Sequence, residues 1–216
     1  TKSNYQTILK EEDFKNLLKV LNKQEYLSLD LETTSVLAIS AKIVGISFSF
    51  KPETGYYIPL GHTENIEQLD IDYVLKNLKP ILENRNIRKI GQNLKYETII
   101  FKNYDINLDG IFFDTMIAAH SIDSSLQSYS LDNLARRFLD YKMISYKDVT
   151  KVDKKSIPFA DVSIDKASTY SCEDADITLK LYGFLLERLK KYNLLENYLD
   201  YEIPFIKVLA DIEFAG

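Results

Sequence analysis

The spacing of hydrophobic residues changes along the chain between a strand pattern and a helical pattern. Short runs rich in β-branched and aromatic residues are typical of strands, whereas apolar residues three and four apart are typical of helices. Turn residues at 51–55 separate two of the strand-like runs, which predicts a hairpin. The predicted strands are residues 26–31, 43–50, 56–60, 88–91 and 111–113, and the predicted helices are residues 5–22, 71–83, 94–104, 115–122, 130–140 and 164–191.

This order of elements predicts an α/β fold. Hairpin strands come first and strands then alternate with helices, so we expect a mixed sheet of about five strands with helices on both sides. Residues 142–162 are polar and are expected to be rich in loops. Residues 201–216 follow the last long helix and begin a further segment.

Composition narrows the class of protein only a little. The chain has 216 residues, 45% of them hydrophobic and 27% charged, which is ordinary for a globular domain. No apolar run approaches the roughly 20 residues of a transmembrane helix, so we expect no membrane association. The single cysteine, Cys172, excludes an internal disulfide and fits a reducing compartment such as the cytoplasm. A net charge of −5 leans against a nucleic-acid partner, although acidic residues that bind cations add to the negative count.

The first candidate site lies at the end of a predicted strand, in Asp30-Leu31-Glu32. Residues two apart on a strand point to the same face, with Cα atoms about 6.5 Å apart. Two carboxylates so placed can bind one hard cation such as Mg²⁺ or Mn²⁺. Taken alone, the same pattern also describes an acidic strand end that faces water.

Two further segments carry candidate chemistry. Tyr170 and Asp174 are four residues apart in the long predicted helix and therefore lie on one face, where the phenol could orient a cation-bound water. A buried tyrosine bonded to its helical neighbour is the alternative. Asn93 and Glu97 fall at the start of another helix, where Asn93 is expected to be the N-cap and the dipole favours the charge of Glu97.

Together and in this order, these segments resemble the 3′–5′ exonuclease (proofreading) domain of the family A, or bacterial DNA polymerase I, enzymes. That domain belongs to the superfamily with an Asp-Glu-Asp-Asp set and a tyrosine in its third motif. The resemblance covers essentially the whole chain, and its main segments are residues 29–33, 44–48, 57–60, 91–96, 113–116, 131–135 and 173–176. It implies a ribonuclease H-like fold, with residues 1–195 as the exonuclease domain and residues 196–216 as the truncated start of a polymerase domain.

The resemblance also implies roles for single residues. Asp30, Glu32, Glu97 and Asp174 would bind two divalent ions, Mg²⁺ or Mn²⁺, and Tyr170 with Glu32 would position the attacking water. A second group would contact the single-stranded 3′ end of DNA: Val36, Gln92, Asn93, Tyr96 and Tyr146. The expected partners are therefore that DNA end and a polymerase domain of the same chain, and the expected state is a monomer in the cytoplasm.

One position departs from the family pattern, because Glu97 stands where an aspartate is usual. The extra methylene adds about 1.5 Å, comparable to the tolerance of a two-metal site, while the charge and the oxygen ligands are kept. We expect activity that is retained but reduced.

Three other functions are consistent with parts of the sequence. The departure at Glu97 allows a catalytically silent exonuclease fold with a structural or DNA-guiding role. A ribonuclease of the RNase D type would share the carboxylates and the tyrosine, and a protein-interaction module would need none of them. His62 and His120 lie outside the motifs and are interpreted as structural, which argues against a zinc hydrolase.

Overall fold

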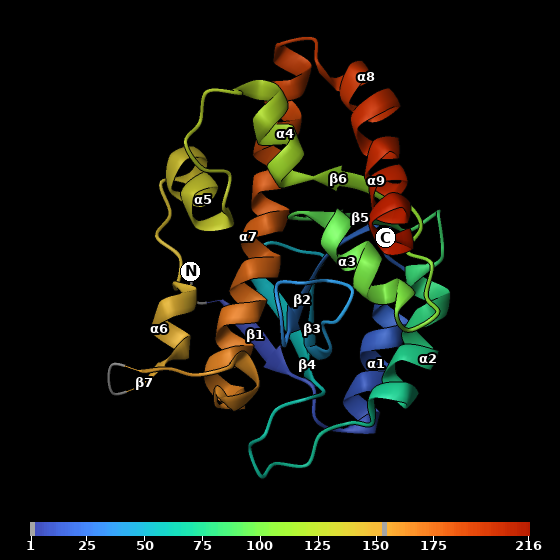
Figure 1. Cartoon of the computed structure of the whole chain (residues 1–216), viewed down its shortest axis with the longest axis vertical. Coiled ribbons are helices and arrows are strands. Elements are labelled where there is room, and N and C mark those ends of the chain that lie inside the picture. The colour runs from blue at the N-terminus through green and yellow to red at the C-terminus, as the bar shows by residue number, and fades with distance from the viewer. Residues whose placement is uncertain (1–2, 153–154) are drawn as a thin grey trace.

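The computed structural model describes residues 3–152 and 155–216, and within them one six-stranded mixed sheet forms the centre of the protein (Figure 1). The strand order is β1-β4-β3-β2-β5-β6. β2, β3 and β4 form an antiparallel meander, and the other three neighbouring pairs of this sheet are parallel. The strands are β1 (Asn4–Thr7), β2 (Tyr26–Thr33), β3 (Ile43–Ser49), β4 (Thr54–Pro59), β5 (Arg88–Gly91) and β6 (Ile111–Asp114).

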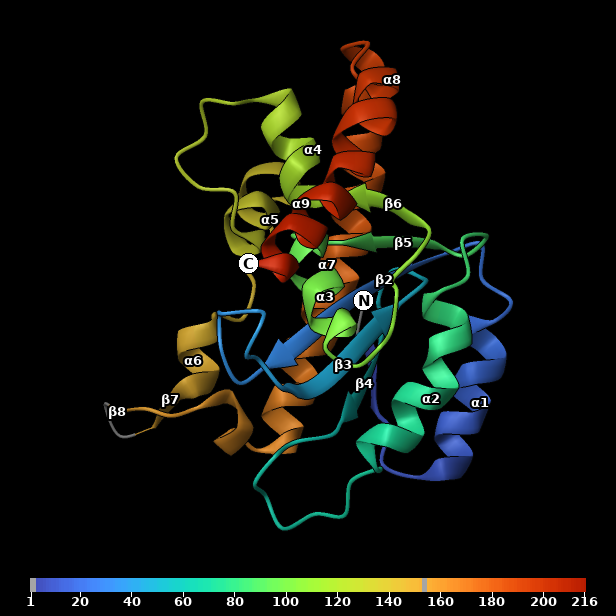
Figure 2. The same ribbon diagram turned by 45° about the vertical axis from the view of Figure 1, so that its right-hand side comes forward.

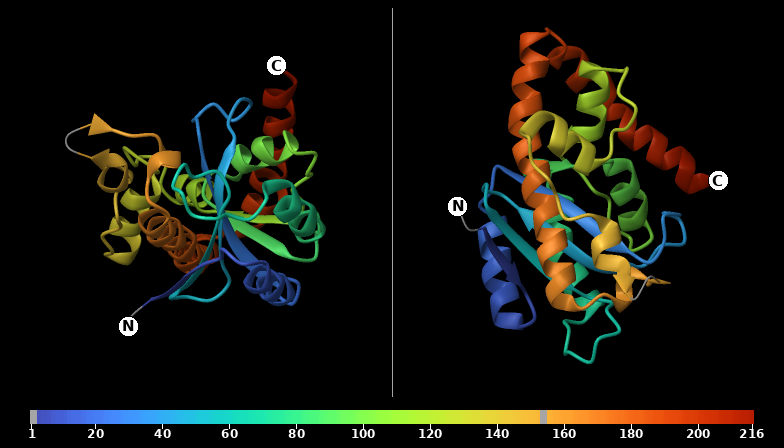
Figure 3. Two further views of the ribbon diagram at one scale, coloured as in Figure 1. Left: turned by 90° about the horizontal axis from the view of Figure 1, so that it is seen from below. Right: turned by 90° about the vertical axis from the view of Figure 1, so that its left-hand side faces the viewer.

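Helices cover both faces of this sheet, as the ribonuclease H-like expectation requires. The long helix α7 packs across β1 to β4 on one face, whereas α1, α2 and α3 lie on the other (Figure 3). The helices are α1 (Glu11–Leu21), α2 (Ile71–Leu82), α3 (Leu94–Lys102), α4 (Thr115–Ile122), α5 (Leu131–Leu139), α6 (Tyr146–Thr150), α7 (Ile164–Lys191), α8 (Leu195–Asn197) and α9 (Ile203–Ala215).

The first predicted helix begins too early, and this prediction is wrong at its N-terminal end. Residues 4–7 form β1, an edge strand paired in parallel with β4, and the helix starts only at Glu11. Its buried residues, from Phe14 to Leu21, begin the helical spacing. Three acidic residues occupy the first turn, where the helix dipole favours negative charge. The missed strand accounts for six strands where about five were expected.

Two other segments contain more regular structure than the sequence indicated. The stretch expected to be rich in loops contains α6, the two-residue strands β7 (Lys151–Val152) and β8 (Lys155–Ser156), and the 3₁₀ turn η1 (Phe159–Asp161). After α8, a π-helical turn, η2 (Tyr198–Glu202), leads into α9, which lies beside α3 (Figure 2).

The C-terminal segment shares the main hydrophobic core. Tyr198 is fully buried, donates its hydroxyl proton to the Asp114 carbonyl oxygen at 2.9 Å and accepts from the Asp114 amide at 2.7 Å. Lys95 and Lys102 of α3 form ion pairs with Glu213 and Asp211 of α9. The division at residue 195 stays a prediction, but residues beyond it contribute to the packing of this domain.

The period of β2 decides which side chains reach the candidate site. Leu27, Leu29 and Leu31 are buried toward the helices of one face. Asp30 and Glu32 alternate with them and therefore point to the other face, beneath α7. None of the helices described combines the length and the apolar composition that a bilayer crossing requires.

Candidate metal centre

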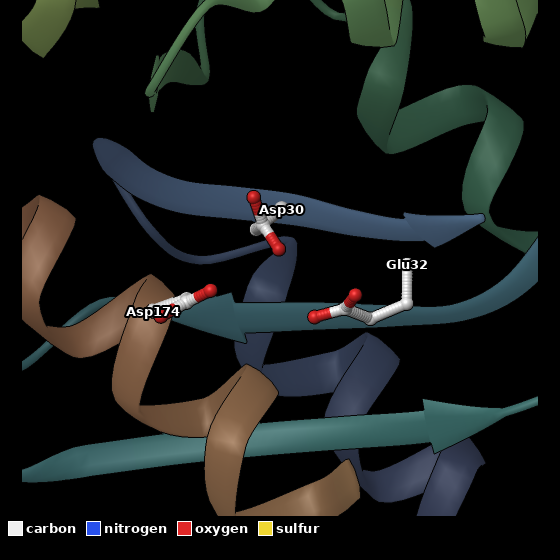
Figure 4. Close-up of side chains that lie close together, drawn as sticks. All are labelled: Asp30, Glu32 and Asp174. Carbon is white, nitrogen blue, oxygen red and sulfur yellow. The ribbon is translucent and has the colours of Figure 1, made fainter. Parts of the chain in front are cut away.

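Three carboxylates from distant parts of the chain meet at one point of the sheet. Asp30 and Glu32 extend from β2 and Asp174 from α7, and one oxygen of each lies within 4.8 Å of the others (Figure 4). The side chains point toward one another in the close-up. This spacing lets one hard cation be bound by all three groups.

The electrostatics of this cluster favour a bound cation or a proton. Burial raises the pKa of Asp30 to about 7. Burial and then the charge of Asp30 raise the pKa values of Glu32 and Asp174 well above their usual range. Among the ion pairs of the described residues, none involves these three carboxylates. Like charges that share a buried space without a basic partner are destabilised until a proton or a metal ion joins them.

Glu97, the fourth expected ligand, lies near this group but outside it. It is buried in the first turn of α3, and its Oε2 has no hydrogen-bond partner within the described part of the chain. Burial and then the charge of Asp30 raise its pKa well above the usual range. Glu97 therefore interacts with the cluster through its charge, while the three-oxygen group is complete without it.

The N-terminus of α3, just before Glu97, is capped by a different side chain from the one expected from the sequence. Asn93 occupies the N-cap position but adopts a left-handed conformation (φ 67°), and its side chain makes no capping hydrogen bond. Asp114 supplies the carboxylate instead and accepts from the Leu94 amide at 2.7 Å. The same side chain caps α4 by accepting from the Met116 and Ile117 amides. Asn93 is thus the N-cap residue as predicted, but the capping hydrogen bond comes from Asp114, 20 positions beyond Leu94.

Tyr170 lies one helical turn before Asp174, as expected. Burial, then the charges of Asp174, Glu32 and Asp30, raise the pKa of its phenol far above the usual range. The hydroxyl therefore stays protonated at neutral pH and can donate a hydrogen bond, which suits the orientation of a water molecule.

A groove of about 630 Å³ opens beside Glu32. Val36 and Tyr146 are 90% and 50% exposed on its walls, and Asn93 and Tyr96 also line it. The Tyr96 hydroxyl is fixed by Thr33 Oγ1 at 2.6 Å and by the Ser35 carbonyl oxygen. Four of the five residues expected to contact a 3′ end thus share one groove.

Gln92, the fifth of these residues, is not among those that line the groove. Its amide donates to the Tyr129 carbonyl oxygen at 2.7 Å and accepts from the Thr115 hydroxyl at 2.5 Å. Its side chain therefore connects β5 to the segments around α4.

The structure also adds residues that the sequence did not single out. Pro158 and Phe159 line the groove, and the Phe159 ring stacks on Tyr146 at 6.0 Å between centroids. Ser171 donates to Glu32 Oε1 at 2.8 Å. No periodic pattern marks Phe159, which lies in a segment expected to be a loop, whereas Ser171 directly follows Tyr170 and could have been tested as a neighbour of the motif.

Comparison with known proteins agrees with this geometry. A family profile described as 3′-5′ exonuclease, of the family A DNA polymerases, matches residues 5–190. The chain therefore belongs to this exonuclease family. It is similar to DNA polymerase I of Pseudomonas aeruginosa (37% identical over 217 residues, 98% of this chain and 24% of the relative). It is also similar to DNA polymerase I of Borreliella burgdorferi (38% over 212 residues, 98% and 23%). The chain thus spans about a quarter of the length of these relatives.

Solved structures resemble the chain in fold. The polymerase domain of Pol1 from M. smegmatis superposes with a TM-score of 0.76 at 18% identity, over 97% of this chain and 32% of that one. RNase D of Escherichia coli, described as an exoribonuclease, superposes with a TM-score of 0.73 at 18% identity, over 96% and 50%. Brucella melitensis NrnC with bound Mg²⁺ has a TM-score of 0.71 at 14% identity, over 100% and 95%. At these identities the likeness concerns the fold alone, and it confirms the ribonuclease H-like architecture.

Proposed function

We propose that this chain is a metal-dependent 3′–5′ exonuclease that removes nucleoside 5′-monophosphates from single-stranded 3′ ends of DNA. The observation that supports it best is the meeting of Asp30, Glu32 and Asp174 within 4.8 Å in a member of an exonuclease family. The donors fit divalent cations such as Mg²⁺ or Mn²⁺, because they are hard oxygen atoms without a basic partner in the described part of the chain. Glu97, whose buried Oε2 accepts no hydrogen bond from the described residues, would be available to a second ion.

The protein residues would divide the work as follows. Asp30 shares the three-oxygen group with Asp174, and its charge also acts on Glu97, so it would bind both ions. Two divalent ions held there would supply activation of a water molecule and stabilisation of the leaving 3′-oxygen. Tyr170 and Glu32 would orient that water toward the phosphorus. Tyr96 and Tyr146 would stack on or flank the terminal bases, and stacking accepts all four bases.

A polymerase domain of the same chain is the proposed intramolecular partner. The relatives are polymerases about four times as long as this chain. The outer face of α9 is apolar and exposed at Phe205, Val208 and Ile212, as expected of a helix that another domain covers. In this setting the reaction would be proofreading. The enzyme would act on DNA in the cytoplasm as a monomer.

Hydrolysis of a labelled DNA strand tests the proposal. With a 5′-labelled single strand and Mg²⁺ or Mn²⁺, we expect a ladder that shortens from the 3′ end and releases nucleoside 5′-monophosphates. EDTA or Asp30→Ala should abolish it, whereas Asp165→Ala, which changes an exposed acid of the same site-bearing helix α7, should not. Hydrolysis that survives in Asp30→Ala would contradict the proposed metal centre.

The likeness to RNase D gives a second candidate function, because that structure is described as an exoribonuclease. An RNA strand of the same sequence, run beside the DNA strand, separates the two. Faster trimming of RNA would favour the ribonuclease. If the metal-loaded protein trimmed neither strand, the result would favour a catalytically silent exonuclease fold, the alternative suggested by the glutamate at position 97.

A further inference from the structure

A buried hydrogen-bonded group lies directly behind Glu32, outside the cluster of carboxylates. Ser171 is fully buried on α7 and donates its only hydroxyl proton to Glu32 Oε1 at 2.8 Å. A bond from a hydroxyl to a carboxylate is charge-assisted and roughly twice as strong as a neutral one. Because this bond occupies a lone pair of Oε1, Oε2 keeps both of its lone pairs for a cation.

Tyr57 forms the wall behind Ser171 and Glu32. It is fully buried on β4, and its hydroxyl lies against Ser171. The same hydroxyl occupies the space that a side chain at position 45 would need, since a Cβ there would lie 2.1 Å from it. Gly45 is the cross-strand partner of Glu32. Because a glycine has no side chain, the Tyr57 hydroxyl can lie beside the strand that carries Glu32.

His62 fixes the direction of the Tyr57 hydroxyl. His62 Nδ1 lies 2.9 Å from the Val162 carbonyl oxygen, which can only accept, so this nitrogen carries the proton. In the neutral ring Nε2 is then an acceptor, and the Tyr57 hydroxyl, 2.7 Å away, donates to it. The Tyr57 oxygen consequently has no proton left for Ser171, and Ser171 has no competing donor on that side.

We propose that Ser171 is the positioning residue for Glu32 in metal binding, and that Tyr57 and His62 hold Ser171 in this role. This rests on the metal centre proposed above. Ser171 does not touch the substrate or the ion; it selects which carboxylate oxygen of Glu32 faces them. Removing an outer hydrogen bond of this kind from a metal ligand typically costs 10- to 100-fold in metal affinity or activity.

Mn²⁺ binding provides the test, with the free ion followed by its paramagnetic resonance signal. Ser171→Ala should weaken Mn²⁺ binding about 10-fold, and Ser171→Thr, which keeps the hydroxyl, should restore most of it. Ser168→Ala is the matched control, because Ser168 is also buried on α7 but its hydroxyl bonds Thr7 at 2.6 Å. The control should bind Mn²⁺ like the unaltered protein, even if both alanine variants lose stability in urea.

A second variant tests the chain behind Ser171. Tyr57→Phe keeps the ring and removes the hydroxyl, so it should weaken Mn²⁺ binding less than Ser171→Ala, and the double variant should be no worse than Ser171→Ala alone. Fully additive losses would overturn the connected chain, and Mn²⁺ binding by Ser171→Ala at the unaltered affinity would overturn the role of Ser171. An unaltered protein that binds no Mn²⁺ would instead overturn the metal centre and this inference with it, which separates the two failures.

Discussion

Asp174 and Asp176 lie two residues apart on the same helix, and both carboxylates are buried, yet their surroundings are opposite. Asp176 is fully buried and completely paired: it accepts from the Tyr5 hydroxyl at 3.0 Å and from the Glu53 amide at 2.9 Å, and Lys180 lies 3.1 Å away. Asp174 forms no ion pair with the described residues, and the groups that act on its pKa are the carboxylates of Asp30, Glu32 and Glu173 and the hydroxyl of Tyr170.

The difference separates a structural acid from a functional one. Asp176 joins β1 and the β3–β4 turn to α7, so its buried charge is neutralised inside the protein. The charge of Asp174 can instead be neutralised by a bound cation or a proton. Buried acids with strongly perturbed pKa values and no internal partner are typical of active sites. Two acids in one motif can thus be distinguished by what surrounds them.

The largest expected effect is on hydrolysis, in Asp174→Asn. Loss of one shared ligand removes several kcal/mol of transition-state stabilisation, so the rate should fall about 10³-fold. Asp176→Asn keeps the metal centre, and its rate per folded molecule should change less than about threefold, because Asp176 is paired with Tyr5, Glu53 and Lys180 and shares no partner with the cluster. The measurement is the initial rate of nucleotide release at saturating Mg²⁺. Equal losses in the two variants would remove the distinction between the acids.

The second effect is on stability and should have opposite signs at the two positions. Without metal, Asp174→Asn relieves repulsion and should raise the free energy of unfolding by about 1 kcal/mol. Asp176→Asn leaves Lys180 without its buried partner and should lower it by about 3 kcal/mol. Urea unfolding in EDTA measures both, and destabilisation by Asp174→Asn would show that its charge is already compensated.

The third effect is a pH dependence that divalent ions remove. The Asp30 carboxyl has an ordinary pKa of 3.8 in the unfolded chain, and burial raises its pKa to about 7 in the folded, metal-free protein. Because the pKa is higher in the folded state, protonated Asp30 contributes to the free energy of unfolding. This contribution is fully present below about pH 4 and is lost as the pH rises through 7. In EDTA, the melting temperature should therefore fall between pH 5.5 and 8 relative to the same series in Mg²⁺. His62, whose pKa burial lowers, is common to both series and cancels. Parallel curves with and without Mg²⁺ would contradict the unpaired cluster.

The smallest effect is expected for Glu97→Asp. The change retracts the carboxylate by about 1.5 Å, toward the length usual in the family, and Glu97 is not one of the three converging ligands. We expect the rate of DNA hydrolysis to rise less than tenfold, with Glu97→Gln as the control that removes the charge at the original length. A rise of several hundredfold would instead indicate a nearly inactive site in the present sequence.

The longer helices and strands could be predicted from the sequence because each contains enough residues to show a periodic pattern. The alternation along β2 placed Asp30 and Glu32 on one face, and the apolar positions of α7 predicted its full span. β1 was missed because four residues at a sheet edge have no period of their own and depend on pairing with β4. The meeting of β2 with α7 came from the family resemblance, since no spacing rule connects residues more than 100 positions apart.

The supporting contacts of the site were harder to predict than its ligands. The N-cap role of Asp114 and the bond from Ser171 to Glu32 join residues 20 and 139 positions apart in the sequence. Serine and aspartate are common in surfaces and caps, so their types alone did not mark them. A carboxylate near a motif reveals its role only when its partners are known.

Tyr198 has a practical consequence for anyone who wants to produce the nuclease by itself. Its ring fills the core beside Phe113, and its hydroxyl bonds both backbone groups of Asp114, whose side chain in turn holds the start of α3. A protein shortened at residue 195 would lose this ring, and deletion of a buried aromatic side chain costs about 3–5 kcal/mol. A nuclease fragment that is stable by itself is therefore expected to include Tyr198 and so to reach into the stretch that the family resemblance assigns to the polymerase domain.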